Sequence, residues 1–97
     1  MTTPALPKAL LAFLKATASA SRMKILLIFI DGQERTVNEI SKAVKLEQST
    51  TSEHLALMKR SGLLLSRKSG RAVYYRPDGE KIAQQIHALG HLVRRCC

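Results

Sequence analysis

The chain has 97 residues, of which 45% are hydrophobic and 24% charged, so it is long enough for one domain with a modest core and has the composition of a folded protein. Sixteen Lys and Arg against seven Asp and Glu give a net charge of +9, which suits a polyanion, either nucleic acid or an anionic membrane surface. The longest apolar run, residues 25–30, is too short to span a bilayer, and the N-terminus lacks the basic region of a secretory signal. These features predict a cytoplasmic protein and exclude a membrane-spanning one.

Apolar spacing predicts two helices in the first third of the chain. The first has Pro7 at its first position and fades at residues 18–21. The second covers residues 22–30 and ends at Asp31 and Gly32. Because the second helix is apolar around most of its circumference, we expect it to be the central core helix.

A helix-turn-helix is predicted next, at about residues 36–61. Thr36 and Glu39 have the spacing of a capping box and open a short third helix. A break at residues 45–48 leads to a fourth helix, which ends at Ser61 and Gly62. The apolar stripe of the fourth helix consists of Thr51, Leu55 and Met58.

A β-hairpin and a final helix complete the predicted fold. Residues 63–67 and 72–76 read as two strands joined by a tight basic turn, which forms a wing at about residues 63–76. A last helix covers about residues 80–95, with an apolar stripe at Ile82, Ile86, Leu89 and Val93. The fold class is therefore mainly α with a small β-hairpin wing, a winged helix-turn-helix, in a single domain spanning residues 1–97.

The polar face of the fourth helix carries small hydroxyls, an amide and a histidine rather than the usual Glu and Lys. Such short side chains near a helix start can enter the major groove and bond base edges or phosphates. The predicted DNA contacts of this helix are Gln48, Ser49, Thr50, Ser52, Glu53, His54 and Arg60. Glu53 is unusual there: it either accepts from a cytosine amino group or faces a gap between the strands.

Basic residues continue into the hairpin without an intervening acid. Between positions 59 and 76 they are Lys59, Arg60, Arg67, Lys68, Arg71 and Arg76. Beside a recognition helix they would neutralise phosphates, and a wing tip formed by Arg67, Lys68 and Arg71 would reach an adjacent minor groove. The alternative is a solvated basic hairpin with no ligand.

The sequence resembles the ArsR/SmtB family of small metal- and effector-responsive bacterial repressors over roughly residues 7–95. The matching segments are ASASRMKILLIF, QSTTSEHLALMKRSGLL and SRKSGRAVYYRP. The resemblance implies a homodimer that binds double-stranded DNA at an imperfect palindrome and represses transcription until an effector arrives. Its two recognition helices would lie about 34 Å apart, one DNA turn.

The same resemblance implies that the first and last helices form the dimer interface. Their apolar residues have more surface than a small core can bury. The candidate interface residues are Leu10, Phe13, Leu14, Ile86, Leu89 and Val93.

Two metal sites of the family are not reproduced in this sequence. The short third helix has no Cys or His in place of the family's metal-binding cysteine motif. The positions matching the family's last-helix site are Asp78, Glu80, His91 and Arg94. An arginine in place of a ligand makes a poor zinc site, since such sites use four N, S or O donors.

Cys96 and Cys97 are the strongest remaining indication of an effector. Paired thiolates bind thiophilic ions, so trivalent arsenic is a candidate, with a third donor from the partner chain. Oxidation or persulfidation is an alternative, favoured by the neighbouring arginines, and incidental terminal cysteines are another. His87 and His91, four residues apart on one helix, can support a metal or form part of an interface. No cofactor is required.

Other function classes find less support. An enzyme is excluded because there are no paired carboxylates, no Gly-rich phosphate loop and no His/Cys constellation outside the last helix. A winged helix that binds a protein or an RNA is the stronger rival to a DNA-binding regulator. A membrane-surface protein is disfavoured because no helix pairs a strong apolar face with a basic one.

Overall fold

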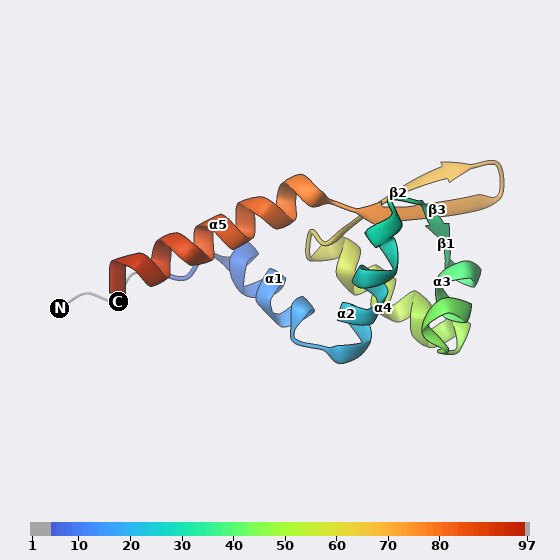
Figure 1. The fold of residues 1–97 in the computed structure, drawn as a ribbon, viewed down its shortest axis with the longest axis horizontal. Helices are drawn as coiled ribbons and strands as arrows, with labels where there is room; N and C mark the ends of the chain where they lie inside the picture. The colour runs from blue at the N-terminus through green and yellow to red at the C-terminus, as the bar shows by residue number, and fades with distance from the viewer. Residues whose placement is uncertain (1–4, 97) are drawn as a thin grey trace.

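The computed structural model describes residues 5–96 and has the predicted winged helix-turn-helix fold, mainly helical with a small antiparallel sheet (Figure 1). In chain order the elements are α1 (Lys8–Thr17), α2 (Ala20–Leu27), the 3-10 helix η1 (Ile28–Asp31), β1 (Arg35–Thr36), α3 (Val37–Val44), α4 (Gln48–Arg60), β2 (Leu64–Ser69), β3 (Ala72–Pro77) and α5 (Gly79–Cys96). Among the described residues, no helix is both long and apolar enough to cross a membrane.

One core joins the helices to the base of the hairpin. Its buried hydrophobic residues are Leu10, Phe13, Ala16, Ile25, Phe29, Ile40, Leu55, Met58, Leu63 and Leu64. They come from α1, α2, η1, α3, α4, the residue before β2 and the first residue of β2, whereas β1, β3 and α5 contribute no fully buried side chain. The helix-turn-helix is therefore packed against the same core as α1, α2 and η1.

The helix-turn-helix begins and turns where the sequence indicates. The Thr36 hydroxyl accepts from the backbone N–H of Glu39 at 3.3 Å, and the Glu39 carboxylate accepts from the backbone N–H of Thr36 at 2.9 Å, which completes the predicted capping box. Helix α3 ends at Lys45, which adopts the left-handed conformation with φ of 58°. Glycine or asparagine usually occupies this position. Two more residues, Leu46 and Glu47, then lead into α4.

The sheet has a third strand that was not predicted. The strand order is β1, β3, β2, all antiparallel, with Arg35 opposite Tyr75 and Thr36 opposite Tyr74. The hairpin turn contains two residues, Gly70 and Arg71, and Gly70 has φ of +61°, which glycine adopts without strain. The short β1 ties the base of the wing to the residue that caps α3.

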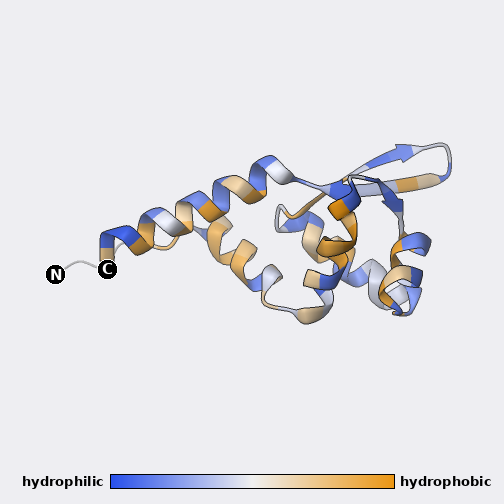
Figure 2. Ribbon diagram, viewed as in Figure 1, coloured by the Kyte–Doolittle hydropathy of each residue, from blue (hydrophilic) through white to orange (hydrophobic). Residues whose placement is uncertain are grey.

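The second helix differs from its prediction in its bounds and its burial. It begins at Ala20, where Ser19 caps it by accepting from the Arg22 N–H at 3.3 Å, and it tightens into η1 after Leu27. The expectation of a helix buried all round is wrong, because Leu27 is 59% exposed and Ile30 is 88% exposed. Only one side of this apolar segment faces the core, through Ile25 and Phe29. Figure 2 shows a hydrophobic stretch where the end of α2 continues into η1, after hydrophilic residues earlier in α2.

Helix α5 lies apart from the helix-turn-helix and runs away from the wing, with α1 as its neighbour (Figure 1). None of its residues is buried. Ile82, Ala88, Leu89 and Leu92 pack against the core as partly buried residues. Pro7, predicted as the first helical residue of α1, is instead the residue that precedes it.

Candidate nucleic-acid interface

Helix α4 buries one stripe and exposes the polar face that the sequence assigns to DNA. Thr51, Leu55 and Met58 are each 0% exposed, which confirms the predicted inward stripe. The opposite side presents Gln48, Ser49, Ser52, Glu53 and Arg60, all exposed, while Thr50 and His54 are half-buried. The helix therefore offers short polar side chains to solvent on a rigidly anchored element.

The start of α4 is suited to an anion. The Thr51 hydroxyl donates to the Glu47 carbonyl at 2.9 Å, so this buried polar group is satisfied inside the helix. Glu47 is the residue before the helix, and in the part of the chain that the structure describes its side chain accepts no capping hydrogen bond from the first turn. The N–H groups of the first turn have no acceptor within an α-helix, and the helix dipole adds partial positive charge there. A DNA phosphate can bind such a helix start.

His54 is held by an arginine from α2. The Nη1 atom of Arg22 lies 3.4 Å from Nδ1 of His54. Because a guanidinium only donates, Nδ1 is the acceptor and the proton of the neutral ring is on Nε2. Arg22 also donates from Nε to the Ala16 carbonyl at 2.7 Å and from Nη2 to the Lys15 carbonyl at 3.2 Å. His54 would thus offer DNA a donor from a ring whose orientation is fixed.

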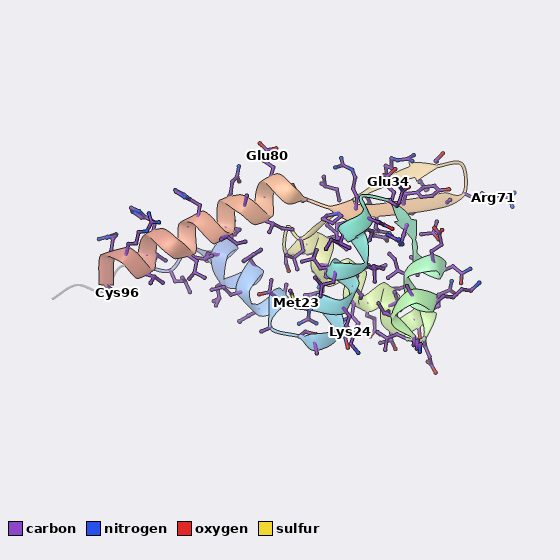
Figure 3. All side chains as sticks on the ribbon, in the orientation of Figure 1. Met23, Lys24, Glu34, Arg71, Glu80 and Cys96 are labelled. Carbon is purple, nitrogen blue, oxygen red and sulfur yellow. The ribbon has the colours of Figure 1, made fainter. Side chains whose placement is uncertain are left out.

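The wing places its basic residues differently from the prediction. Lys68, Arg71 and Arg76 are exposed, and Figure 3 shows Arg71 at the far end of the hairpin. Arg67 lies opposite Tyr74 in the hairpin, and its side chain is directed toward Glu34, which precedes β1, rather than past the turn. Its Nε lies 3.0 Å from both carboxylate oxygens of Glu34, and its Nη2 lies 2.8 Å from Oε1. The assignment of Arg67 to the tip is therefore wrong.

The Glu34–Arg67 pair is accompanied by an aromatic ring and a second ion pair. The guanidinium carbon of Arg67 lies 4.9 Å from the centre of the Tyr74 ring. The hydrogen bonds from Arg67 lower the pKa of Glu34, and Glu34 in turn raises the pKa of Arg67. Arg35 pairs with Asp31 and also donates to the Ile28 carbonyl at 2.8 Å. These contacts fasten the base of the wing to η1.

The apolar face shared by α1 and α5 is smaller than predicted. Leu10 is 0% and Phe13 5% exposed, so they belong to the core of the single chain, and their assignment to a dimer interface is wrong. Leu14 and Leu89 are half-buried. The exposed large apolar residues of the two helices are Leu11, Ile86 and Val93. Leu11 was missed because adjacent leucines leave open which of them faces inward.

The effector candidates lie along the exposed side of α5. His87 and His91 are exposed, and the exposed Cys96 donates from Sγ to the Val93 carbonyl at 3.3 Å. Cys97 lies outside the described residues. Within residues 5–96, no three His, Cys, Asp or Glu residues come together as a metal-binding group. Asp78 accepts from the Lys81 N–H at 3.2 Å at the start of α5, whereas His91 is near its other end.

Two residues that organise this interface were not singled out from the sequence. Arg22 contacts His54 across 32 positions and Glu34 contacts Arg67 across 33. Neither has a local sequence signal, because each contact depends on how separate elements pack. A search for an acid that could compensate one basic wing residue would have found Glu34 as a candidate.

Comparison with known proteins finds relatives among bacterial regulators. Residues 19–66 match the family described as bacterial regulatory protein, arsR family. The transcriptional activator HlyU of Vibrio cholerae is 37% identical over 79 residues, which are 81% of this chain and 72% of HlyU. The arsenical resistance operon repressor of Escherichia coli is 40% identical over 62 residues, 64% of this chain but only 53% of that protein.

Solved structures with similar folds include a homodimer. The homodimeric winged helix-turn-helix DNA-binding domain of a possible ArsR-family regulator from Mycobacterium bovis has a TM-score of 0.71 and 32% identity. The match covers 90% of this chain and 79% of that one. The HlyU structure has a TM-score of 0.70 and 34% identity and covers 87% of this chain and 90% of HlyU.

Proposed function

Because the chain belongs to the ArsR family of bacterial transcriptional regulators, whose DNA-binding domain is a winged helix-turn-helix, we propose that it acts in the cytoplasm as a homodimeric repressor on a palindromic duplex operator. The observation that carries the proposal is the exposed polar face of α4 beside a basic wing. Between positions 59 and 76 every charged side chain is basic, and one of the six, Arg67, is paired with an acid.

The groove-reading residues in this proposal are on α4. Gln48, Ser49 and Ser52 are exposed near the start of the helix and have the donors and acceptors that base edges require. Arg60, Lys68 and Arg71 would contact phosphates on either side. His54, oriented by Arg22, would donate from Nε2.

Dimerisation through α1 and α5 is supported by what a single chain leaves exposed. Helix α5 has eighteen residues and none of them is buried, although an isolated amphipathic helix gains its stability mainly from packing. Ile86 is 58% and Val93 50% exposed on α5, and Leu11 is 40% exposed on α1. A second copy that covers these residues would bring two α4 helices onto one face of DNA, as half-sites of a palindrome require.

For the effector, we propose a thiophilic agent that acts at Cys96 and Cys97, such as trivalent arsenic. A relative bears the name of an arsenical resistance operon repressor, and Cys96 is exposed at the end of the proposed dimerisation helix. A ligand that bridges thiols there would act on the interface that sets the spacing of the α4 helices. Oxidation or persulfidation of the same thiols is the second candidate, because Cys96 is exposed to such reagents.

The DNA-binding proposal is tested by fluorescence anisotropy with a labelled duplex from the region upstream of the gene. We expect saturable binding that weakens log-linearly with salt and is at least tenfold weaker for the double variant Gln48→Ala/Ser52→Ala. The matched control Asn38→Ala/Ser66→Ala removes an amide and a hydroxyl outside α4. Equal binding of both variants to DNA, or no preference for the palindrome, would refute groove reading by α4.

The effector proposal is tested on the same complex by adding arsenite to the reduced protein. We expect the parent to leave the DNA and the Cys96→Ser/Cys97→Ser variant to stay bound. Release of both proteins, or of neither, contradicts arsenic sensing at these thiols. Persulfide and peroxide are then added in the same way to test the second candidate.

A further inference from the structure

A hollow of about 420 Å³ lies between α2 and the end of α3, away from the polar face of α4 and from the apolar face of α1 and α5. It is lined by Lys24, Leu27, Ile28, Ala43, Val44 and Lys45. Its volume is within the range of small-molecule pockets. Figure 3 labels Lys24 on α2, at the edge of the molecule.

The lining combines aliphatic side chains with positive charge. Four of the six residues are aliphatic, the other two are exposed lysines, and none is acidic. The ion pairs of the described chain engage Asp31 and Glu34 with arginines elsewhere, so neither lysine is neutralised by them. An apolar pocket with one or two convergent charges selects a ligand that has a hydrophobic body and an opposite charge.

Two further features lie at or beside the hollow. Lys45 is the one non-glycine residue with positive φ in the described chain, at a helix end where glycine has no steric penalty. Leu27, at 59% exposure, and Ile30, at 88%, extend the apolar surface beyond the pocket. Leu27 ends α2 and Ile30 lies in η1, and positions three apart along helical backbone are neighbours on one side. The lysine side chain at a strained position and the exposed aliphatic surface both fit an amphipathic anion.

We propose that this hollow binds a small amphipathic organic anion, with its aliphatic or aromatic body against Leu27, Ile28, Ala43 and Val44 and its carboxylate or sulfonate between Lys24 and Lys45. Val44 and Lys45 directly precede the turn into α4, which begins at Gln48. A ligand seated there therefore contacts the joint of the helix-turn-helix. Any effect of the bound ligand on DNA binding rests on the proposed function. The binding of the ligand to the hollow does not.

The binding test uses the full chain without DNA and the fluorescent probe 8-anilino-1-naphthalenesulfonate. We expect one saturable site per chain, from which sodium octanoate displaces the probe at least tenfold more effectively than the neutral 1-octanol. Equal displacement by the two would overturn the proposal, because the lysines would then contribute nothing.

Variants locate the site. Ala43→Phe fills the hollow and should weaken probe binding at least tenfold, whereas Ala83→Phe, the same change on an exposed position of α5, should leave it unchanged. Lys24→Gln and Lys45→Gly should each weaken binding by about two- to fivefold, as removal of an exposed charge does, and Lys42→Gln should not. Lys45→Gly also relieves the backbone, so a loss of binding in that variant cannot come from unfolding. Parent-like binding of the probe by Ala43→Phe would overturn the proposal. A loss of probe binding confined to Ile86→Ser would also overturn it and would place the probe on the α1 and α5 face.

Discussion

Arg22 on α2 joins the end of α1 to His54 on the recognition helix. Its guanidinium donates to the carbonyls of Ala16 and Lys15 and lies 3.4 Å from Nδ1 of His54. One side chain thus contacts both the helix proposed to dimerise and the helix proposed to read DNA. A displacement of α1 at the dimer interface would be transmitted to His54 through a single rigid group.

Replacing Arg22 should affect both stability and DNA binding. Arg22→Ala removes two hydrogen bonds to carbonyls and the contact with His54, so we expect the free energy of unfolding to fall by about 1–3 kcal/mol. Arg22→Lys, which cannot span all three acceptors, should recover only part of this. Urea unfolding followed by circular dichroism measures the loss.

The His54→Ala variant separates the two roles of this contact. It leaves the bonds from Arg22 to α1 in place, so we expect weaker DNA binding with a smaller loss of stability than in Arg22→Ala. If Arg22→Ala and His54→Ala bind DNA as the parent does, His54 has no part in groove contact.

The salt dependence of DNA binding should distinguish Arg67 from the other wing cations. Arg67 is held by Glu34 with three contacts of 2.8–3.0 Å, whereas Arg71 lies at the exposed tip. Arg71→Gln should reduce the slope of log K against log salt by about 1, as loss of one phosphate contact does. Arg67→Gln should change it much less.

Glu34→Gln provides the reciprocal test of the wing. It releases Arg67 to solvent, so the salt slope should become steeper than that of the parent if the freed guanidinium then reaches a phosphate. A large drop in slope for Arg67→Gln in the parent background would show instead that Arg67 leaves Glu34 on binding DNA.

Stability should fall in acid because carboxyls at the base of the wing are held ionised. The hydrogen bond from Arg35, and then that from the Gln33 N–H, lower the pKa of Asp31 from 3.8 to about 2. A pKa that is lower in the folded state contributes stability that is present above the unfolded value, near pH 4, and is lost as the pH falls toward about 2. Urea midpoints measured from pH 5 to pH 2.5 should therefore converge for the parent and Asp31→Asn.

Arg35→Gln is the control for this pH dependence. It removes the donor that lowers the pKa of Asp31, so it should flatten the curve as Asp31→Asn does. Parallel curves for the parent and Asp31→Asn across this pH range would contradict the assignment.

Features set by neighbours in the chain were predictable from sequence. The capping box of Thr36 and Glu39 needs four consecutive residues, and the stripe of Thr51, Leu55 and Met58 needs only helical periodicity. Together they placed the helix-turn-helix and its exposed polar face. The hairpin followed from a glycine-containing turn between two apolar runs, although the turn consists of Gly70 and Arg71 and not of the predicted Ser69 and Gly70.

Features that depend on packing between elements were not predictable in this way. Periodicity places Leu10 and Leu11 on neighbouring faces of α1 but does not say which face the core takes; Leu10 is buried and Leu11 is 40% exposed. The Glu34–Arg67 pair depends on β1 joining the sheet, and β1 has only two residues. The continuously apolar run at residues 25–30 has no polar side chain to show which side is outward.

Disruption of the α1 and α5 face should convert a dimer to monomers. Ile86 on α5 is 58% exposed and Leu27 on α2 is 59% exposed, so Ile86→Glu and Leu27→Glu place the same charge at equally exposed aliphatic positions. We expect Ile86→Glu to raise the dimer dissociation constant by about thirtyfold or more, since a charge at a central interface position costs about 2 kcal/mol or more. Sedimentation equilibrium measures it. Because Leu27 is outside the proposed interface, the Leu27→Glu variant should remain dimeric. If Leu27→Glu dissociates and Ile86→Glu remains a dimer, the interface lies on α2 instead.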